Sequence, residues 1–165
     1  MREVYVALGS NIDPAARLLR AARLLRTHFA AARFSACYRN AAVGFAGEDF
    51  VNAVVGFSTE LPVPELLHVL HAIEAQCGRA REDQKWGPRA MDLDLLLYGN
   101  EIGEGPGYAL PRRDLLRRAY MLGPLAQLAP DLLHPVAGKS IGVLWHAFAQ
   151  AEHPLIATAP DLNAA

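Results

Sequence analysis

The order in which strand-like and helix-like patterns follow one another is the feature of this sequence that most restricts its fold. Four runs rich in β-branched, aromatic and aliphatic residues predict strands over residues 4–8, 34–39, 51–59 and 92–98. One helical pattern lies between the first and second runs, and another lies between the third and fourth. A strand, helix, strand, strand, helix, strand order allows only a few compact arrangements, because consecutive elements are usually neighbours in space.

The two helical patterns carry ordinary start and stop signals. Asp13 precedes Pro14, the arrangement of an N-cap followed by proline at the first helical position. The second pattern follows a pair of prolines and ends before Gly78. Two short helical segments are appended, over residues 121–128 and 141–148. We therefore predict an α+β fold, a ferredoxin-like β-α-β-β-α-β sandwich in which an antiparallel sheet is covered by two helices, with additional helices.

Length and composition predict one soluble domain. A chain of 165 residues without a linker, repeat or low-complexity region is expected to form a single domain over residues 1–165, with a loosely held tail from about residue 157. A net charge of -1 argues against nucleic-acid binding, and no apolar stretch approaches the length of a membrane span. Only Cys37 and Cys77 are present, which favours a reducing, cytoplasmic location. We expect a monomer.

A pair of aspartates at the start of the last predicted strand can hold divalent cations. Asp92 and Asp94 are two residues apart, so both point to one face of the strand while Leu93 and Leu95 point to the other. Magnesium is typically bound by one or two carboxylates together with substrate phosphates. The alternative for these two residues alone is a half-exposed strand without a site.

The loop before this strand concentrates positive charge. Four basic residues and a tryptophan lie within it: Arg79, Arg81, Lys85, Arg89 and Trp86. Cations beside two carboxylates suit phosphoryl transfer, where the transferred group is anionic and catalysis is mostly positioning and charge neutralisation. Trp86 in a polar, proline-containing loop favours a closing lid over a purely solvated loop.

Other motifs exclude or weakly support particular sites. The chain has no G-x-x-x-x-G-K-S/T element, which excludes a P-loop, and its histidines show no spacing typical of a zinc site. Gly9 closes the first strand, where backbone amides can approach a ligand. Phe50, Asn52 and Tyr120 could stack on and hydrogen-bond a flat heterocycle, although any single aromatic is more often part of a core.

Three segments of the chain form a recognisable set. They are Ala7-Leu8-Gly9-Ser10-Asn11, Ile73-Glu74 with Gly78-Arg79-Ala80-Arg81, and Trp86-Gly87-Pro88-Arg89-Ala90-Met91-Asp92-Leu93-Asp94-Leu95. Together they resemble the hydroxymethyl-dihydropterin pyrophosphokinase family of folate biosynthesis. The resemblance extends over roughly residues 4 to 150, and the W-G-P-R-x-x-D-L-D block is its most specific part. It implies transfer of pyrophosphate from ATP to the hydroxymethyl group of the pterin, with release of AMP.

The resemblance also implies roles for individual residues. Asp92 and Asp94 would bind two magnesium ions, and Arg79 and Arg89 would contact the phosphates during transfer. Six residues would form the nucleotide side: Glu74, Arg81, Trp86, Leu95, Arg112 and Arg118. Six would form the pterin side: Gly9, Asn40, Val43, Phe50, Asn52 and Tyr120.

Two departures from the family pattern bear on substrate binding. The family usually has histidine after the proline at Pro111, where this chain has Arg112, and often has threonine at the position of Asn40.

The competing functions are a ferredoxin-like module that binds a pterin or nucleotide without catalysis, and a metal-dependent phosphohydrolase that uses the same aspartates.

Overall fold

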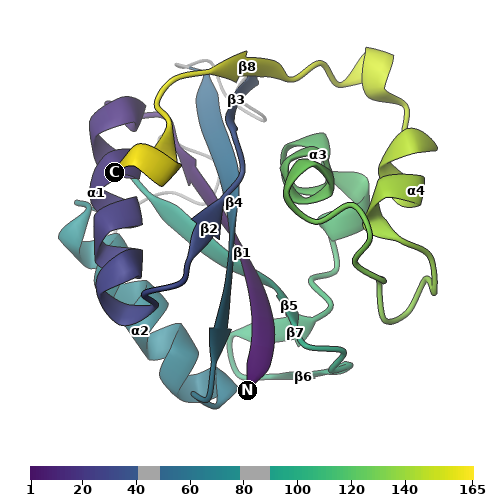
Figure 1. Cartoon of the computed structure of the whole chain (residues 1–165), viewed down its shortest axis with the longest axis horizontal. Coiled ribbons are helices and arrows are strands. Elements are labelled where there is room, and N and C mark those ends of the chain that lie inside the picture. The colour runs from purple at the N-terminus through teal and green to yellow at the C-terminus, as the bar shows by residue number, and fades with distance from the viewer. Residues whose placement is uncertain (41–48, 79–89) are drawn as a thin grey trace.

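The chain folds into three layers, with a sheet between two layers of helices (Figure 1). The computed structural model describes residues 1–40, 49–78 and 90–165. One layer contains α1 (Pro14–His28) and α2 (Val63–Gln76), and the other contains α3 (Ala119–Leu128) and α4 (Ile141–His146). The additional helices predicted near the C-terminus thus cover the second face of the sheet.

The central sheet is antiparallel, and its order is β5-β1-β4-β3-β8. Its strands are β5 (Asp92–Tyr98), β1 (Arg2–Ser10), β4 (Phe50–Thr59), β3 (Cys37–Asn40) and β8 (Ile156–Thr158). The long strands β1 and β4 lie in the middle and pair over nine residues. This arrangement confirms the predicted α+β, ferredoxin-like fold.

The second predicted strand is divided into two pieces. β2 (Arg33–Phe34) and β3 both pair with β4, and Ser35 lies between them. Ser35 donates its backbone N–H to the carbonyl of Val54, and its hydroxyl oxygen accepts the N–H of Val54. A side-chain oxygen therefore replaces one backbone acceptor, and the strand is interrupted as at a β-bulge.

Alternation along β1 assigns its side chains to two cores. Val4, Val6 and Leu8 pack on the α1 and α2 side, whereas Tyr5 and Ala7 pack on the α3 side. All five are at least nine-tenths buried. A strand covered on both faces has no polar face, which explains the uninterrupted apolar run at residues 4–8.

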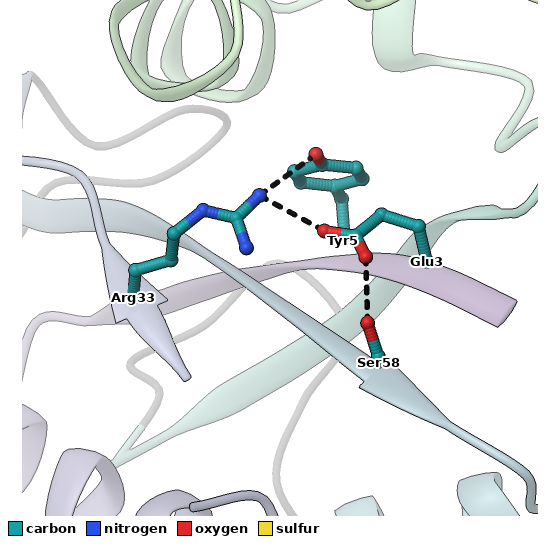
Figure 2. Close-up of polar contacts among 4 residues, drawn as sticks. All are labelled: Glu3, Tyr5, Arg33 and Ser58. Carbon is teal, nitrogen blue, oxygen red and sulfur yellow. Dashed lines mark hydrogen bonds and ion pairs between the residues drawn. The ribbon is translucent and has the colours of Figure 1, made fainter. Parts of the chain in front are cut away.

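A polar network ties three strands together at the end of the sheet where β1 begins (Figure 2). Arg33 of β2 donates to the Glu3 carboxylate at 2.9 Å and to the Tyr5 hydroxyl at 3.1 Å, both on β1. Ser58 of β4 donates to the second Glu3 oxygen at 2.7 Å. Hydrogen bonds from Ser58, Arg33 and Tyr5 and the Arg33 charge lower the pKa of Glu3, although burial opposes them. These contacts support the pairing of Glu3 with Ser58.

Two expectations concern the ends of elements. Asp13 occupies the N-cap position of α1 as predicted, but its backbone is left-handed, with φ 45°, and its side chain makes no capping hydrogen bond. The tail from residue 157 is not loosely held, because β8 pairs with β3 and Leu162 is buried. Arg26 of α1 also donates to the carbonyl of Asn163 at 3.1 Å.

The remaining elements are short. β6 (Gly103–Gly105) and β7 (Tyr108–Leu110) form a separate two-stranded sheet. Single 3₁₀ turns are η1 (Leu115–Arg117), η2 (Gln150–Glu152) and η3 (Leu162–Ala164). In the described ranges, no helix combines the length and apolar character needed to span a membrane.

Candidate functional site

The register of the sheet brings predicted residues from distant segments to one end of the strands. Gly9 of β1 pairs with Asn52 of β4 on one side and with Asp92 of β5 on the other. Ala7, which packs on the α3 side, pairs with Asp94. Alternation then places Gly9, Asn52, Asp92 and Asp94 on the sheet face toward α3.

Two amides lie together at this end of the sheet. Asn52 is buried and donates from Nδ2 to Oδ1 of Asn40 on β3. Asn40 in turn pairs with Phe50 in the strand register, and Phe50 is partly exposed. An aromatic ring beside a buried amide suits a flat heterocycle with polar edges. The structure therefore brings Asn40, Phe50 and Asn52 together.

The two aspartates lie on β5 as the alternation predicts. Asp92 and Asp94 are partly exposed, whereas Leu93 and Leu95 are buried in the core beneath α1 and α2. Nη1 of Arg112 lies 3.7 Å from Oδ1 of Asp94. Two carboxylates on one face of a strand therefore remain accessible beside a guanidinium group.

Arg112 belongs to the segment that crosses from β7 to α3. Its backbone N–H donates to the carbonyl of Leu96 on β5 at 2.9 Å, and its Nε donates to Oδ1 of Asp114 at 2.8 Å. Asp114 was not among the predicted site residues. A single carboxylate two residues after an arginine gives no pattern in the sequence.

Tyr120 of α3 lies near Arg118 and near Asp94. Burial raises the pKa of Tyr120, and the charges of Arg118, Asp114, Asp94 and Arg112 also act on it. Nε of Arg118 is buried and has no hydrogen-bond partner within the described ranges. A buried guanidinium nitrogen without an acceptor suits an anionic ligand.

A cavity of about 170 Å³ lies beside β5, between α2 and β7. It contains four of the predicted residues: Glu74, Leu95, Asp94 and Arg112. Glu74 is only 7% exposed, and its Oε2 accepts the backbone N–H of Leu93 at 2.8 Å. His71 and Tyr108 also line this cavity and were not predicted. The position of His71, three residues before Glu74 on one helix face, is the signal that could have identified it.

The donor set fits magnesium. Within residues 1–40, 49–78 and 90–165, no group of three or more His, Cys, Asp and Glu side chains could hold a metal ion. Asp92 and Asp94 supply two hard oxygen ligands, and magnesium in nucleotide sites characteristically takes one or two carboxylates with phosphates and water. The basic groups at Arg112 and Arg118 suit those phosphates.

Some predicted site residues fall outside the described part of the chain. They are Val43, Arg79, Arg81, Trp86 and Arg89. The segments that contain them, 41–48 and 79–89, join directly to β4 and to the residues before β5. Asn40 and Phe50 stand close to the ends of the first segment, and Asp92 follows the second.

Sequence relatives share most of the chain. A 2-amino-4-hydroxy-6-hydroxymethyldihydropteridine pyrophosphokinase of Synechocystis sp. is 40% identical over 139 residues, which are 82% of this chain and 71% of that protein. The protein of the same name in Pseudomonas aeruginosa is 41% identical over 141 residues, covering 82% of this chain and 85% of its own length.

Solved structures share the fold. A Plasmodium falciparum HPPK-DHPS with pterin and p-hydroxybenzoate superposes with a TM-score of 0.67 at 12% identity, over 91% of this chain. The present chain spans 43% of that longer protein, so the likeness concerns one part of it. A second HPPK-DHPS structure from the same organism, with SDX-DHP, gives a TM-score of 0.64.

A family model covers most of the sheet together with α1, α2 and α3. The model of 7,8-dihydro-6-hydroxymethylpterin-pyrophosphokinase matches residues 5–130. This range includes every residue discussed above as part of the site. The chain belongs to the 7,8-dihydro-6-hydroxymethylpterin-pyrophosphokinase family.

Proposed function

We propose that this protein transfers a pyrophosphate group from ATP to 6-hydroxymethyl-7,8-dihydropterin, giving AMP and the pterin diphosphate. The observation that carries the proposal is the pairing of Gly9 with both Asn52 and Asp92. This register places amides suited to a heterocycle beside carboxylates suited to a metal–nucleotide complex. Both reactants can therefore bind within reach of each other at one end of the sheet.

The pterin would bind between β3, β4 and the start of α3. Phe50 and Tyr120 would sandwich the ring, and Asn52 would hydrogen-bond its edge with Asn40 beside it. Gly9 would leave room for the ligand at the end of β1, and Val43 would complete this side. The burial that raises the pKa of Tyr120 supports a place for its ring on the buried side of the ligand.

ATP would bind along β5 and the segment before α3. Asp92 and Asp94 would hold two magnesium ions, which neutralise phosphate charge and orient the phosphates when bound. Four described residues would line the nucleotide: Glu74, Leu95, Arg112 and Arg118. We assign phosphate contacts to Arg79 and Arg89, and loop closure over the site to Arg81 and Trp86.

The reaction requires positioning more than a protein nucleophile. The hydroxymethyl oxygen would form a bond to the β-phosphorus, the bond from that phosphorus to the bridging oxygen of AMP would break, and the hydroxyl proton would pass to solvent. The guanidinium groups would stabilise the negative charge that spreads over the phosphate oxygens. The rigid sheet would hold the two ligand sites in register, which lowers the entropic part of the barrier.

Product analysis tests this function. Purified protein is incubated with ATP, magnesium and hydroxymethyl-dihydropterin, and AMP and pterin diphosphate are measured by chromatography. Equal amounts of the two products are expected. ADP or free phosphate would instead indicate a kinase or a phosphohydrolase. Pterin binding without turnover would indicate a non-catalytic binding module.

We also propose a cytoplasmic monomer that acts as a single domain. Both cysteines, Cys37 and Cys77, are free and buried, and burial raises the pKa of Cys37 to about 12. Unreactive buried thiols suit a reducing compartment. The two helical layers already cover both faces of the sheet, so the core needs no second copy.

The absence of a side chain at position 9 is expected to matter for pterin binding. A Cβ atom at Gly9 would lie 2.7 Å from Oδ1 of Asn52, too close for either group to stay in place. We expect Gly9→Ala to weaken pterin binding about fivefold to tenfold, the effect of misplacing one or two hydrogen bonds. Isothermal titration with the pterin in the presence of a non-hydrolysable ATP analogue measures this effect.

Gly56→Ala is the matched control for Gly9→Ala. Its Cβ atom would meet the ring of Tyr5 at 2.8 Å, so it adds a similar clash at the far end of the same pair of strands. We expect Gly56→Ala to lower stability without changing pterin affinity. Equal loss of pterin affinity in both variants would contradict the local role of Gly9.

Glu74 is expected to support the start of β5 as well as the nucleotide side. Glu74→Ala removes the acceptor of the Leu93 N–H in a buried place and is expected to destabilise the protein by about 1–3 kcal/mol. Glu74→Gln keeps a side-chain oxygen and should lose less stability than Glu74→Ala. Urea denaturation measures the free energy of unfolding of both variants, and equal losses would show that the hydrogen bond to Leu93 is unimportant.

A further inference from the structure

Arg112 lies between two carboxylates, one of which is a proposed metal ligand. Its Nε donates to Oδ1 of Asp114 at 2.8 Å, and its Nη1 lies 3.7 Å from Oδ1 of Asp94. The three side chains are each about one-third exposed, between 32% and 36%. The guanidinium group therefore bridges a proposed metal ligand and a carboxylate that has no assigned role.

The backbone around Arg112 fixes this arrangement. Its N–H donates to the carbonyl of Leu96, two residues along β5 from Asp94, at 2.9 Å. Its carbonyl accepts the N–H of Leu115 at 3.2 Å, and the Leu115 side chain is fully buried. The backbone of Arg112 is thus anchored to β5. Asp114 accepts a hydrogen bond from Nε, and Nη1 lies toward Asp94.

A positive charge beside Asp94 opposes the binding of a metal ion to the same carboxylate. A unit charge near 4 Å changes the local electrostatic free energy substantially even where water screens it. The phosphates of ATP offer a guanidinium group stronger, bidentate acceptors than a single carboxylate oxygen. Arg112 can therefore pair with Asp94 before ATP binds and with the ATP phosphates afterwards.

We propose that Arg112 is a built-in countercharge for Asp94, held in place by Asp114, and that ATP phosphates draw it away from this carboxylate. A divalent cation then binds Asp94 together with the nucleotide and only weakly before it. This inference rests on the proposed function, because it concerns the same magnesium and ATP sites. It adds a positioning role for Asp114. It also adds that the divalent cation binds Asp94 with ATP and not before it.

The first test measures Mn²⁺ binding in the absence of nucleotide. The electron paramagnetic resonance signal of free Mn²⁺ gives the amount that is not bound. Arg112→Gln is expected to bind Mn²⁺ about fivefold to tenfold more tightly than the unmodified protein, because a partly screened positive charge is removed. Unchanged or weaker Mn²⁺ binding by Arg112→Gln would overturn the proposal.

Arg113→Gln provides the matched control. Arg113 is the next residue, its side chain is 75% exposed, and it pairs with Glu104 rather than with a site carboxylate. The same charge is therefore lost one position away. We expect Mn²⁺ affinity to stay within about twofold of the unmodified protein, as for a screened surface charge. An equal gain in both variants would show a general effect of net charge and would overturn the specific role of Arg112.

Asp114→Asn tests the second carboxylate and predicts the opposite sign. Without the Asp114 charge, Arg112 should turn fully toward Asp94, and nucleotide-free Mn²⁺ binding should weaken. Tighter Mn²⁺ binding in Asp114→Asn would contradict the bridging arrangement. Thermal unfolding of each variant shows whether the protein is folded. Because Arg112→Gln and Asp114→Asn are expected to shift Mn²⁺ affinity in opposite directions, the test does not depend on either variant alone.

Addition of a non-hydrolysable ATP analogue should reverse the effect of Arg112→Gln. With the analogue present, the variant is expected to bind the Mn²⁺–nucleotide complex more weakly than the unmodified protein, because it lacks a phosphate contact. A purely structural role would change both measurements in the same direction. If AMP and pterin diphosphate form in equal amounts but no reversal occurs, the countercharge role fails while the proposed function stands.

Discussion

Replacing Asp92 or Asp94 with asparagine is expected to lower the rate of pyrophosphate transfer by about 10³-fold, the effect of losing roughly 4 kcal/mol of metal-dependent charge stabilisation. Both carboxylates are partly exposed on the β5 face opposite the buried Leu93 and Leu95. The substitution therefore removes a metal ligand without opening the core. AMP formation under saturating ATP and magnesium measures the loss.

Two comparisons separate loss of function from loss of fold. The circular dichroism spectrum and unfolding midpoint of both variants should match those of the unmodified protein, because the half-exposed ion pair of Asp94 with Arg112 adds little stability. Asp131→Asn is the control substitution, since Asp131 is exposed beyond the end of α3. A folded Asp94→Asn variant with near-normal turnover would show that the carboxylate is not a metal ligand.

The largest expected effect on stability comes from truncating Phe57. Its side chain is 1% exposed near the C-terminal end of β4, and its ring stacks on Phe29 with 3.9 Å between the ring centroids. Phe57→Ala is expected to destabilise the protein by about 3–5 kcal/mol, because it leaves a cavity and removes an aromatic contact. Urea denaturation followed by fluorescence measures this loss.

Activity should distinguish this effect from damage to the site. Phe57 pairs with Val4, whereas the site residue Asn52 lies five positions earlier on β4 and pairs with Gly9. Folded Phe57→Ala protein at low temperature should therefore keep near-normal turnover. Phe57→Leu, which fills most of the space, should lose much less stability. A stability loss as large with leucine as with alanine would indicate strain rather than a cavity.

The fold was predictable because its main elements have consistent local signals. The runs at residues 4–8, 51–59 and 92–98 are β-rich and bounded by turn residues, and they became β1, β4 and β5. The interruption at Ser35 was not predictable, since it depends on a hydrogen bond to Val54 on another strand. The order of the C-terminal tail likewise depends on pairing with β3, more than a hundred residues earlier.

The candidate site was predictable only in part. The alternation of Asp92 and Asp94 follows from the geometry of any strand, and the family resemblance pointed to Asn52 and Glu74. Their positions relative to one another depend on register, which no local pattern encodes. The bridge from Arg112 to Asp114 and Asp94 depends on how the chain crosses β5 after β7, so only the folded chain reveals it.

The short strand β8 also affects how the molecule behaves at high concentration. It occupies the outer side of β3, where backbone groups would otherwise be free to pair with a neighbouring molecule. β8 has only three residues, so it offers a foreign strand little length along which to add. The final segment thus leaves little of the β3 edge open to pairing with a neighbouring molecule.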